Sequence, residues 1–161
     1  SLVDSMENLW LSKSWTTRPI RPGESPDSYV FVNHEQFESS IDNGKFLEWA
    51  EFQGNLYGTP LPEAPEGMHI LLEIDVQGAA AVIEKSIPAL LIFVDAPSLE
   101  DQARRLRGRG DPEAEVEKRI LKGELERERA KELGAHIIIN DDLERTIQEI
   151  RTLIESQAND H

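Results

Sequence analysis

Residues 69–76, His69-Ile-Leu-Leu-Glu-Ile-Asp-Val76, form a nearly continuous apolar run of strand length. Residues 89–95 form a second run of the same kind. Continuous apolar runs of this length are typical of parallel strands that are buried on both faces of a sheet. We therefore predict that these two runs lie at the centre of a largely parallel sheet covered by helices, which places the chain in the α/β class.

Further strands and helices are predicted on both sides of these runs. Asn33 followed by Gln36 predicts a capping box that opens a helix, and Gly44 predicts the end of that helix. Ser98 with Asp101 predicts the start of another helix. The expected strands are 29–32, 46–52, 69–76, 89–95 and 136–140, and the expected helices are 33–44, 98–107, 111–134 and 143–154. The tail, 158–161, is expected to be disordered.

Composition limits the class of protein. A length of 161 residues predicts one domain with a core of its own. The net charge of -14, from 31 acidic and 17 basic residues, argues against nucleic acid as a partner, because phosphate backbones require a basic surface. There is no cysteine and no apolar run of membrane-spanning length, which is compatible with a cytoplasmic protein that has no membrane partner. The oligomeric state is left open.

Two arginines lie close together near the N-terminus. Arg18 and Arg21 are separated by three positions in a segment interrupted by Pro19 and Pro22, so both guanidinium groups can converge on one phosphate. Ser14 adds a short hydroxyl donor. The alternative is a proline-rich surface loop with incidental charges.

The strand predicted at 46–52 carries a candidate base-recognition residue. Side chains alternate between faces along a strand, so Glu48 is expected to point away from Leu47 and Trp49, whose face packs. A carboxylate can accept hydrogen bonds from both N1–H and the 2-amino group of guanine. Glu48 is therefore the candidate base reader, with Thr59 beside it, and a solvent-facing glutamate is the alternative.

Two carboxylates interrupt the apolar run 69–76. Glu73 and Asp75 are two positions apart, so on a strand they share one face. Buried carboxylates are costly unless they are paired or bound to something, and the carboxyl ends of parallel strands are where ligands bind in open α/β sheets. We expect a ligand-binding role for this pair; the alternative is a structural ion pair with an arginine.

A second group of arginines follows in the predicted helices. Arg105, Arg109 and Arg119 can neutralise the charge of a transferring phosphoryl group, and Gly108 and Gly110 allow this region to close as a lid. Ordinary helix-surface arginines are the alternative. The four histidines have no metal-ligand spacing, and no metal site is predicted from protein side chains.

Four motifs occur in one order along the chain: S-x-T-T-R-x-x-R-x-G-E at 14–24, E-W-A at 48–50, Y-G-T at 57–59 and E-I-D-V-Q-G at 73–78. Together they resemble guanylate kinase from about Asn8 to the C-terminal helix. The resemblance implies a three-layer P-loop kinase core with a parallel sheet, a small mixed β GMP-binding subdomain and a helical lid. Within one domain, 1–161, it implies a GMP-binding subdomain at 8–60, a core at 68–97 and 135–158, and a lid with flanking helices at 98–134.

The resemblance also implies an activity and site residues. The activity is phosphoryl transfer from ATP to GMP with Mg²⁺, giving ADP and GDP. The residues implied to hold the GMP phosphate are Ser14, Arg18, Arg21, Tyr29 and Tyr57, and those implied to contact guanine or organise the acceptor site are Glu48, Thr59, Glu73 and Asp75. The implied catalytic arginines are Arg18, Arg105, Arg109 and Arg119. The residues implied on the ATP side are Arg105, Arg109, Asn140 and Asp141.

One family feature is missing from the sequence. No G-x-x-x-x-G-K-[ST] string is present, and the backbone N–H groups of that loop are the main cradle for ATP phosphates. We therefore expect an N-terminally incomplete guanylate kinase, and we expect this chain itself to be catalytically weak or inactive. The alternative is a non-catalytic module of the same fold that binds GMP or a phosphorylated peptide.

Overall fold

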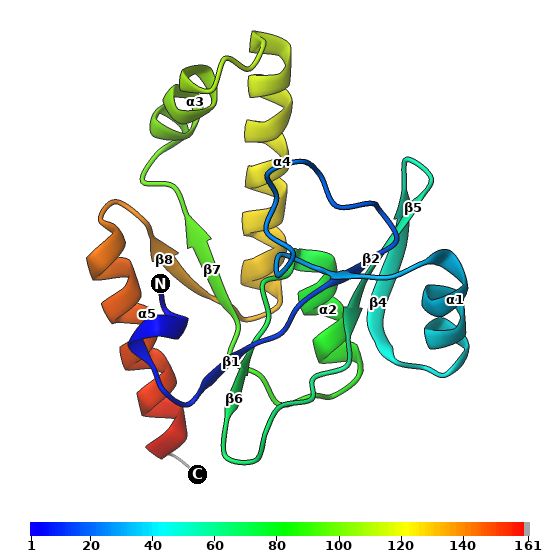
Figure 1. Ribbon diagram of the computed structural model, residues 1–161. Helices are drawn as coiled ribbons and strands as arrows, with labels where there is room; N and C mark the ends of the chain where they lie inside the picture. The colour runs from blue at the N-terminus through cyan, green and yellow to red at the C-terminus, as the bar shows by residue number, and fades with distance from the viewer. Residues whose placement is uncertain (160–161) are drawn as a thin grey trace. The chain divides into compact units, whose positions relative to one another are not determined.

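The computed structural model describes residues 1–159 and shows helices together with parallel strand pairs, which confirms the α/β class (Figure 1). The chain divides into two units. The N-terminal unit is Val3–Ser86, and the C-terminal unit runs from Ile87 onward and includes Ser1–Leu2. Each unit has its own buried hydrophobic cluster.

The strands of the N-terminal unit range from two to seven residues in length. In chain order its elements are η1 (Val3–Ser5), β1 (Leu9–Leu11), β2 (Trp15–Thr16), β3 (Val30–Phe31), α1 (His34–Asp42), β4 (Phe46–Phe52), β5 (Asn55–Pro60), β6 (His69–Leu71) and α2 (Val76–Glu84).

A four-stranded mixed sheet dominates this unit, with the strand order β3-β2-β5-β4. β2 is parallel to β3 and antiparallel to β5, and β5 is antiparallel to β4. The β4–β5 hairpin closes through Gln53 and Gly54, both of which have positive φ angles, 51° and 76°. Beyond the end of β2, Leu56 N donates to Thr17 Oγ1 at 2.8 Å and Thr17 N donates to Leu56 O at 3.0 Å.

An aromatic cluster joins one face of this sheet to α1. Phe37 and Phe46 stack with ring centroids 4.5 Å apart, and Trp15 meets Phe46 edge-on at 5.4 Å. The capping box predicted at the start of α1 is confirmed: Gln36 N donates to Asn33 Oδ1 at 2.8 Å, and Asn33 N donates to Gln36 Oε1 at 3.1 Å. The cap therefore sets the start of the helix that delivers Phe37 to the core.

The apolar run 69–76 does not form one strand. β6 ends at Leu71 and is parallel to β1, whereas Val76 already belongs to α2. Asp75 is the N-cap of α2, and its Oδ1 accepts from Gly78 N at 2.9 Å. The strand prediction was wrong beyond Leu71, because an aspartate that accepts a backbone N–H three residues later favours a helix start over continued strand.

The C-terminal unit has two parallel strands and three helices among its described residues. Its elements are β7 (Ile92–Asp95), α3 (Leu99–Gly108), α4 (Glu113–Glu132), β8 (His136–Ile139) and α5 (Leu143–Asn159). Asp101 N donates to Ser98 Oγ at 3.0 Å, so the predicted cap of α3 is confirmed. The N-cap of α4 is Pro112, which makes no side-chain cap, so Asp111 does not cap this helix.

A small core packs α3 against α4, and an ion pair joins α4 to β7. Leu106 of α3 and Val116 of α4 belong to its buried cluster. Arg127 of α4 pairs with Asp95 at the end of β7, and only 12% of the Asp95 side chain is exposed. α5 extends through Asn159, so the tail predicted at 158–161 is helical for Ala158 and Asn159, while the remainder lies outside the described residues.

Candidate functional site

The face of the mixed sheet opposite Trp15 collects several of the predicted site residues. Thr16 and Ala50 both pair with Tyr57, and Glu48 pairs with Thr59. Directly paired residues on neighbouring strands point to the same face, and so do residues two positions apart on one strand. Tyr57, Thr59 and Glu48 therefore lie on one face of the sheet.

Glu48 and Thr59 are joined by a hydrogen bond. Thr59 Oγ1 donates to Glu48 Oε1 at 2.6 Å, and Thr59 is buried. This bond fixes the orientation of the Glu48 carboxylate, and Oε2 takes no part in it. The pair therefore presents an oriented acceptor on the sheet face.

A bulge between Phe46 and Glu48 changes the alternation that the sequence predicted. Leu47 is 4% exposed and Trp49 is 47% exposed, so the two do not share a packed face. The prediction was correct for Leu47 and wrong for Trp49. The extra residue of a bulge lets two successive side chains, here Phe46 and Leu47, both reach the interior.

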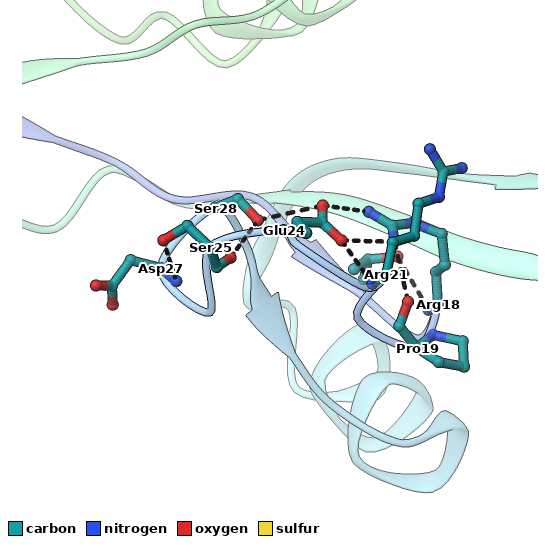
Figure 2. A network of polar contacts seen from close by, with 8 residues as sticks. Arg18, Pro19, Arg21, Glu24, Ser25, Asp27 and Ser28 are labelled. Carbon is teal, nitrogen blue, oxygen red and sulfur yellow. Dashed lines mark hydrogen bonds and ion pairs between the residues drawn. The ribbon is translucent and has the colours of Figure 1, made fainter.

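Arg18 is held by a neighbouring carboxylate. Its Nη1 and Nη2 donate to Glu24 Oε2 and Oε1 at 2.9 and 2.7 Å, and Nη1 also donates to Pro19 O at 2.9 Å (Figure 2). The hydrogen bonds from Arg18, followed by the one from Arg21 N, lower the pKa of Glu24 to about 2. The same pairing raises the pKa of Arg18, so both groups are ionised at neutral pH.

Aromatic rings surround this arginine. Arg18 Cζ lies 5.5 Å from the ring centroid of Tyr29 and 5.8 Å from that of Phe31. The Tyr29 and Tyr57 centroids are 6.4 Å apart, and the Tyr57 hydroxyl also contributes to the raised pKa of Arg18. The structure therefore brings together Arg18, Tyr29 and Tyr57. Phe31 was missed, although alternation along 29–32 places it on the same face as Tyr29.

Arg21 and Ser14 contribute mainly backbone hydrogen bonds to this region. Arg21 N donates to Glu24 Oε2 at 2.9 Å, while the Arg21 guanidinium points away from the carboxylate (Figure 2). Ser14 O accepts from Val30 N at 2.9 Å, which ties the segment before Arg18 to β3. In this structure the two guanidinium groups do not converge on one point.

Glu73 and Asp75 do not lie on a buried strand, where they were predicted. Both are exposed, and neither lies in a strand. They are thus not a buried pair on one strand face: Asp75 caps α2, and Glu73 belongs to the segment between β6 and α2.

The predicted ATP-side residues lie in the C-terminal unit. Arg105 Nη2 donates to Asn140 O at 3.3 Å, which brings α3 to the segment after β8. Asp141 pairs with Arg145, a residue that the sequence analysis did not single out. Arg119 Nη1 lies 3.8 Å from Asp111 Oδ2, and Arg109 is the exposed C-cap of α3.

The described residues contain neither a metal-binding cluster nor a membrane-spanning helix. Within residues 1–159, no group of three or more histidine or acidic side chains is placed to hold a metal ion. No helix in the described part of the chain is long and apolar enough to cross a membrane.

The family model and the relatives described below all belong to the guanylate kinase family. The family model for guanylate kinase matches residues 4–157. A guanylate kinase from Rubrobacter xylanophilus is 42% identical over 153 residues, which cover 92% of this chain and 80% of that protein. A guanylate kinase from Streptomyces kasugaensis is 41% identical over 156 residues, 93% of this chain and 76% of that protein.

A solved structure agrees with these sequence relatives. The crystal structure of guanylate kinase from Anaplasma phagocytophilum superposes with a TM-score of 0.70 at 28% sequence identity. The match covers 97% of this chain and 80% of that chain.

Proposed function

Because the chain belongs to the guanylate kinase family, we propose that the sheet face bearing Tyr57, Thr59 and Glu48 binds GMP as the phosphoryl acceptor. Its function is that of a guanylate kinase, a nucleoside monophosphate kinase. The observation that carries the assignment of the site is the clustering of Arg18 with Tyr29 and Tyr57 beside the Glu48–Thr59 pair.

The phosphate of GMP is assigned to the cationic and hydroxyl-bearing side chains. Arg18 supplies a planar set of N–H donors suited to phosphate oxygens, and the two tyrosine hydroxyls supply further donors. Arg21, whose guanidinium points away from Glu24, is free to turn toward a bound anion. The full phosphate set is Ser14, Arg18, Arg21, Tyr29 and Tyr57.

The guanine base is assigned to Glu48 and Thr59. The Thr59 hydrogen bond occupies Glu48 Oε1, and the remaining acceptor capacity of the carboxylate suits the N1–H and 2-amino donors of guanine. Adenine has no such donor pair, so this arrangement favours GMP over AMP. Asp75 organises the acceptor side by capping α2, with Glu73 in the segment that leads to it.

The donor side is assigned to ATP with Mg²⁺. Arg105, Arg109 and Arg119 neutralise charge on the transferring phosphoryl group, a reaction in which positioning and electrostatics supply most of the catalysis. Asn140 and Asp141 are assigned to the adenine side. The described side chains do not form a site that fits a metal ion by itself, and Mg²⁺ is commonly held largely by nucleotide phosphates, whose charge it neutralises.

The domain plan is part of the same proposal. It divides the chain into a GMP-binding subdomain at 8–60, a core at 68–97 and 135–158, and a lid with flanking helices at 98–134. The cytoplasmic location expected from the sequence also remains part of it.

Calorimetric titration with GMP, AMP and guanosine tests the acceptor site. We expect GMP to bind more tightly than AMP, because of Glu48, and more tightly than guanosine, because of the phosphate contacts. Equal affinities for GMP and AMP would contradict the base assignment. Tight binding of a phosphoserine peptide with negligible GMP binding would contradict the acceptor assignment as a whole.

A single substitution isolates the base reader. Glu48→Gln replaces an acceptor by an amide donor and is expected to weaken GMP binding by about 1–3 kcal/mol while leaving AMP binding unchanged. Glu51→Gln, an exposed glutamate on the same strand, is the matched control and is expected to have no effect on either nucleotide. Equal losses for GMP and AMP would refute the assignment of Glu48.

A further inference from the structure

The carboxylate of Glu24 connects the ends of the loop that carries the candidate phosphate-binding arginines. It accepts hydrogen bonds from Arg18 Nη1 and Nη2, from Arg21 N and, at 3.3 Å, from the Ser28 hydroxyl (Figure 2). No role was predicted for Glu24 from the sequence. Its central position among these hydrogen bonds indicates a role in arranging this loop.

The contacts divide the Arg18 guanidinium into two edges. Glu24 occupies the edge formed by Nη1 and Nη2, and Pro19 O accepts the other Nη1 hydrogen. The edge formed by Nε and the second Nη2 hydrogen takes no part in the contacts with Glu24 and Pro19, and a further polar neighbour of the guanidinium is the hydroxyl of Tyr57, itself a candidate phosphate ligand. A guanidinium has five N–H donors in a fixed planar arrangement, so its second edge can bind a phosphate while the first stays bound to a carboxylate.

Glu24 is itself anchored independently of Arg18. Glu24 N donates to Arg21 O at 3.0 Å, and Arg21 N donates back to Glu24 Oε2 at 2.9 Å, which closes the turn 21–24. Only 19% of the Glu24 side chain is exposed, and 11% of that of Arg18. An acid anchored in this way fixes the orientation of the guanidinium and does not need to leave when an anion arrives.

We propose that Glu24 is a positioning residue, which holds Arg18 so that its Nε and Nη2 edge is presented to the phosphate of GMP. The inference rests on the proposed function, because it takes GMP as the ligand of Arg18. It predicts that removing the carboxylate weakens phosphate binding. If Glu24 instead competed with the phosphate for Arg18, removing it would tighten that binding. The low pKa of Glu24 supports a pair that stays ionised throughout the neutral range.

The test is calorimetric titration of the wild-type chain, Glu24→Gln and Asp27→Asn with GMP and with guanosine. Asp27 is the matched control, because it lies in the same loop, its side chain is 85% exposed, and it pairs with Lys13 outside the Arg18 network. Glu24→Gln is expected to weaken GMP binding by about tenfold or more, since hydrogen bonds between ionised groups are the strong ones. Guanosine binding is expected to be unchanged in all three proteins, and GMP binding unchanged in Asp27→Asn.

A double-mutant cycle with Arg18→Lys asks whether Glu24 acts through Arg18. Lysine cannot offer two parallel N–H donors, so Arg18→Lys alone is expected to cost as much GMP affinity as Arg18→Lys with Glu24→Gln. Additive losses would overturn the inference. Glu24→Asp, which keeps the charge but shortens its reach, provides a second variant if Glu24→Gln does not fold, and it too is expected to bind GMP more weakly.

The outcomes separate this inference from the proposed function. A wild-type chain that binds GMP no more tightly than guanosine would contradict both. A phosphate-selective wild type whose affinity is unchanged or tightened in Glu24→Gln would contradict only the positioning role. Equal losses for GMP and guanosine would show a general structural role and would also contradict it.

Discussion

Gly58 lies in β5 between the two residues that we assign to the acceptor nucleotide, and its other side borders the aromatic cluster. A Cβ added at this position would lie 2.8 Å from Phe46 Cδ1 and 2.9 Å from Phe37 Cζ. Ordinary carbon contacts are 3.5–4.0 Å. The φ angle of Gly58 is outside the left-handed region, so an alanine here is disfavoured by lack of space and not by its backbone conformation.

Two effects of Gly58→Ala oppose each other. Losing a glycine reduces the conformational entropy of the unfolded chain and stabilises a protein by about 0.4–1 kcal/mol. Inserting a methyl group into a packed aromatic cluster costs about 1–3 kcal/mol. The rings are stacked on one another at 4.5 Å and have little room to move, so the second effect dominates. We expect a net loss of about 1–2 kcal/mol in the free energy of unfolding.

Urea unfolding followed by far-UV circular dichroism measures this loss. Gly108→Ala is the matched control: Gly108 ends α3, has no atom within 4 Å of an added Cβ, and is expected to be neutral or slightly stabilising. Phe46→Leu replaces the ring that supplies two of the three nearest atoms by a smaller side chain and leaves Phe37 Cζ in place, so Gly58→Ala should cost less, though not nothing, in that background. A Gly58→Ala protein as stable as the wild type would refute the packing argument.

Three further predictions concern stability. Glu24 has a folded pKa of about 2 against an ordinary value of 4.5, so its contribution is complete above about pH 4.5 and is lost as the pH falls toward 2; the stability difference between wild type and Glu24→Gln should vanish over that window in acid unfolding. Arg127→Met leaves Asp95 nearly buried without its partner and should lower the unfolding free energy by about 3 kcal/mol in urea, whereas Arg129→Met, whose partner Glu132 is exposed, should change it little. Asn33→Ala removes the α1 cap and should cost about 1 kcal/mol by thermal unfolding; an unchanged melting temperature would show that the cap contributes nothing.

Signals that act over a few residues predicted two helix starts and one strand correctly. Asn33 with Gln36, and Ser98 with Asp101, marked helix starts that the structure confirms. β4 runs from Phe46 to Phe52 as predicted. In each case the decisive hydrogen bond or apolar pattern is contained within the segment itself, so the sequence carries the information directly.

The errors come from competition between local signals or from the partner strand. The apolar run 69–76 favoured one long strand, but Asp75 and the alanines that follow it begin α2. The bulge near Leu47 depends on how β4 pairs with β5, and no pattern within 46–52 predicts it. Both errors affected candidate site residues, because they changed where Glu73 and Asp75 lie and which neighbours share the face of Glu48.

The phosphate region shows a different limit. The sequence predicts that Arg18 and Arg21 can converge on one phosphate, and the structure adds that Arg18 pairs with Glu24 and that the Arg21 guanidinium points away from this carboxylate. Side-chain partners within a loop depend on its turns, such as 21–24, and the spacing of charges alone does not determine them. Tyr57 belongs to the Y-G-T motif, and its ring centroid lies 6.4 Å from that of Tyr29.

The hydrogen bond from Leu56 N to Thr17 Oγ1 joins residues 39 positions apart, and it has a consequence for the order of folding. The β4–β5 hairpin closes through two residues and can form within microseconds, whereas β2 can add to β5 only after the longer loop has closed. During synthesis, Arg18 is added to the chain well before Tyr57. The candidate phosphate site is therefore complete only after β2 has docked on β5, a late and long-range step. A slow step in this docking also delays the first binding of nucleotide.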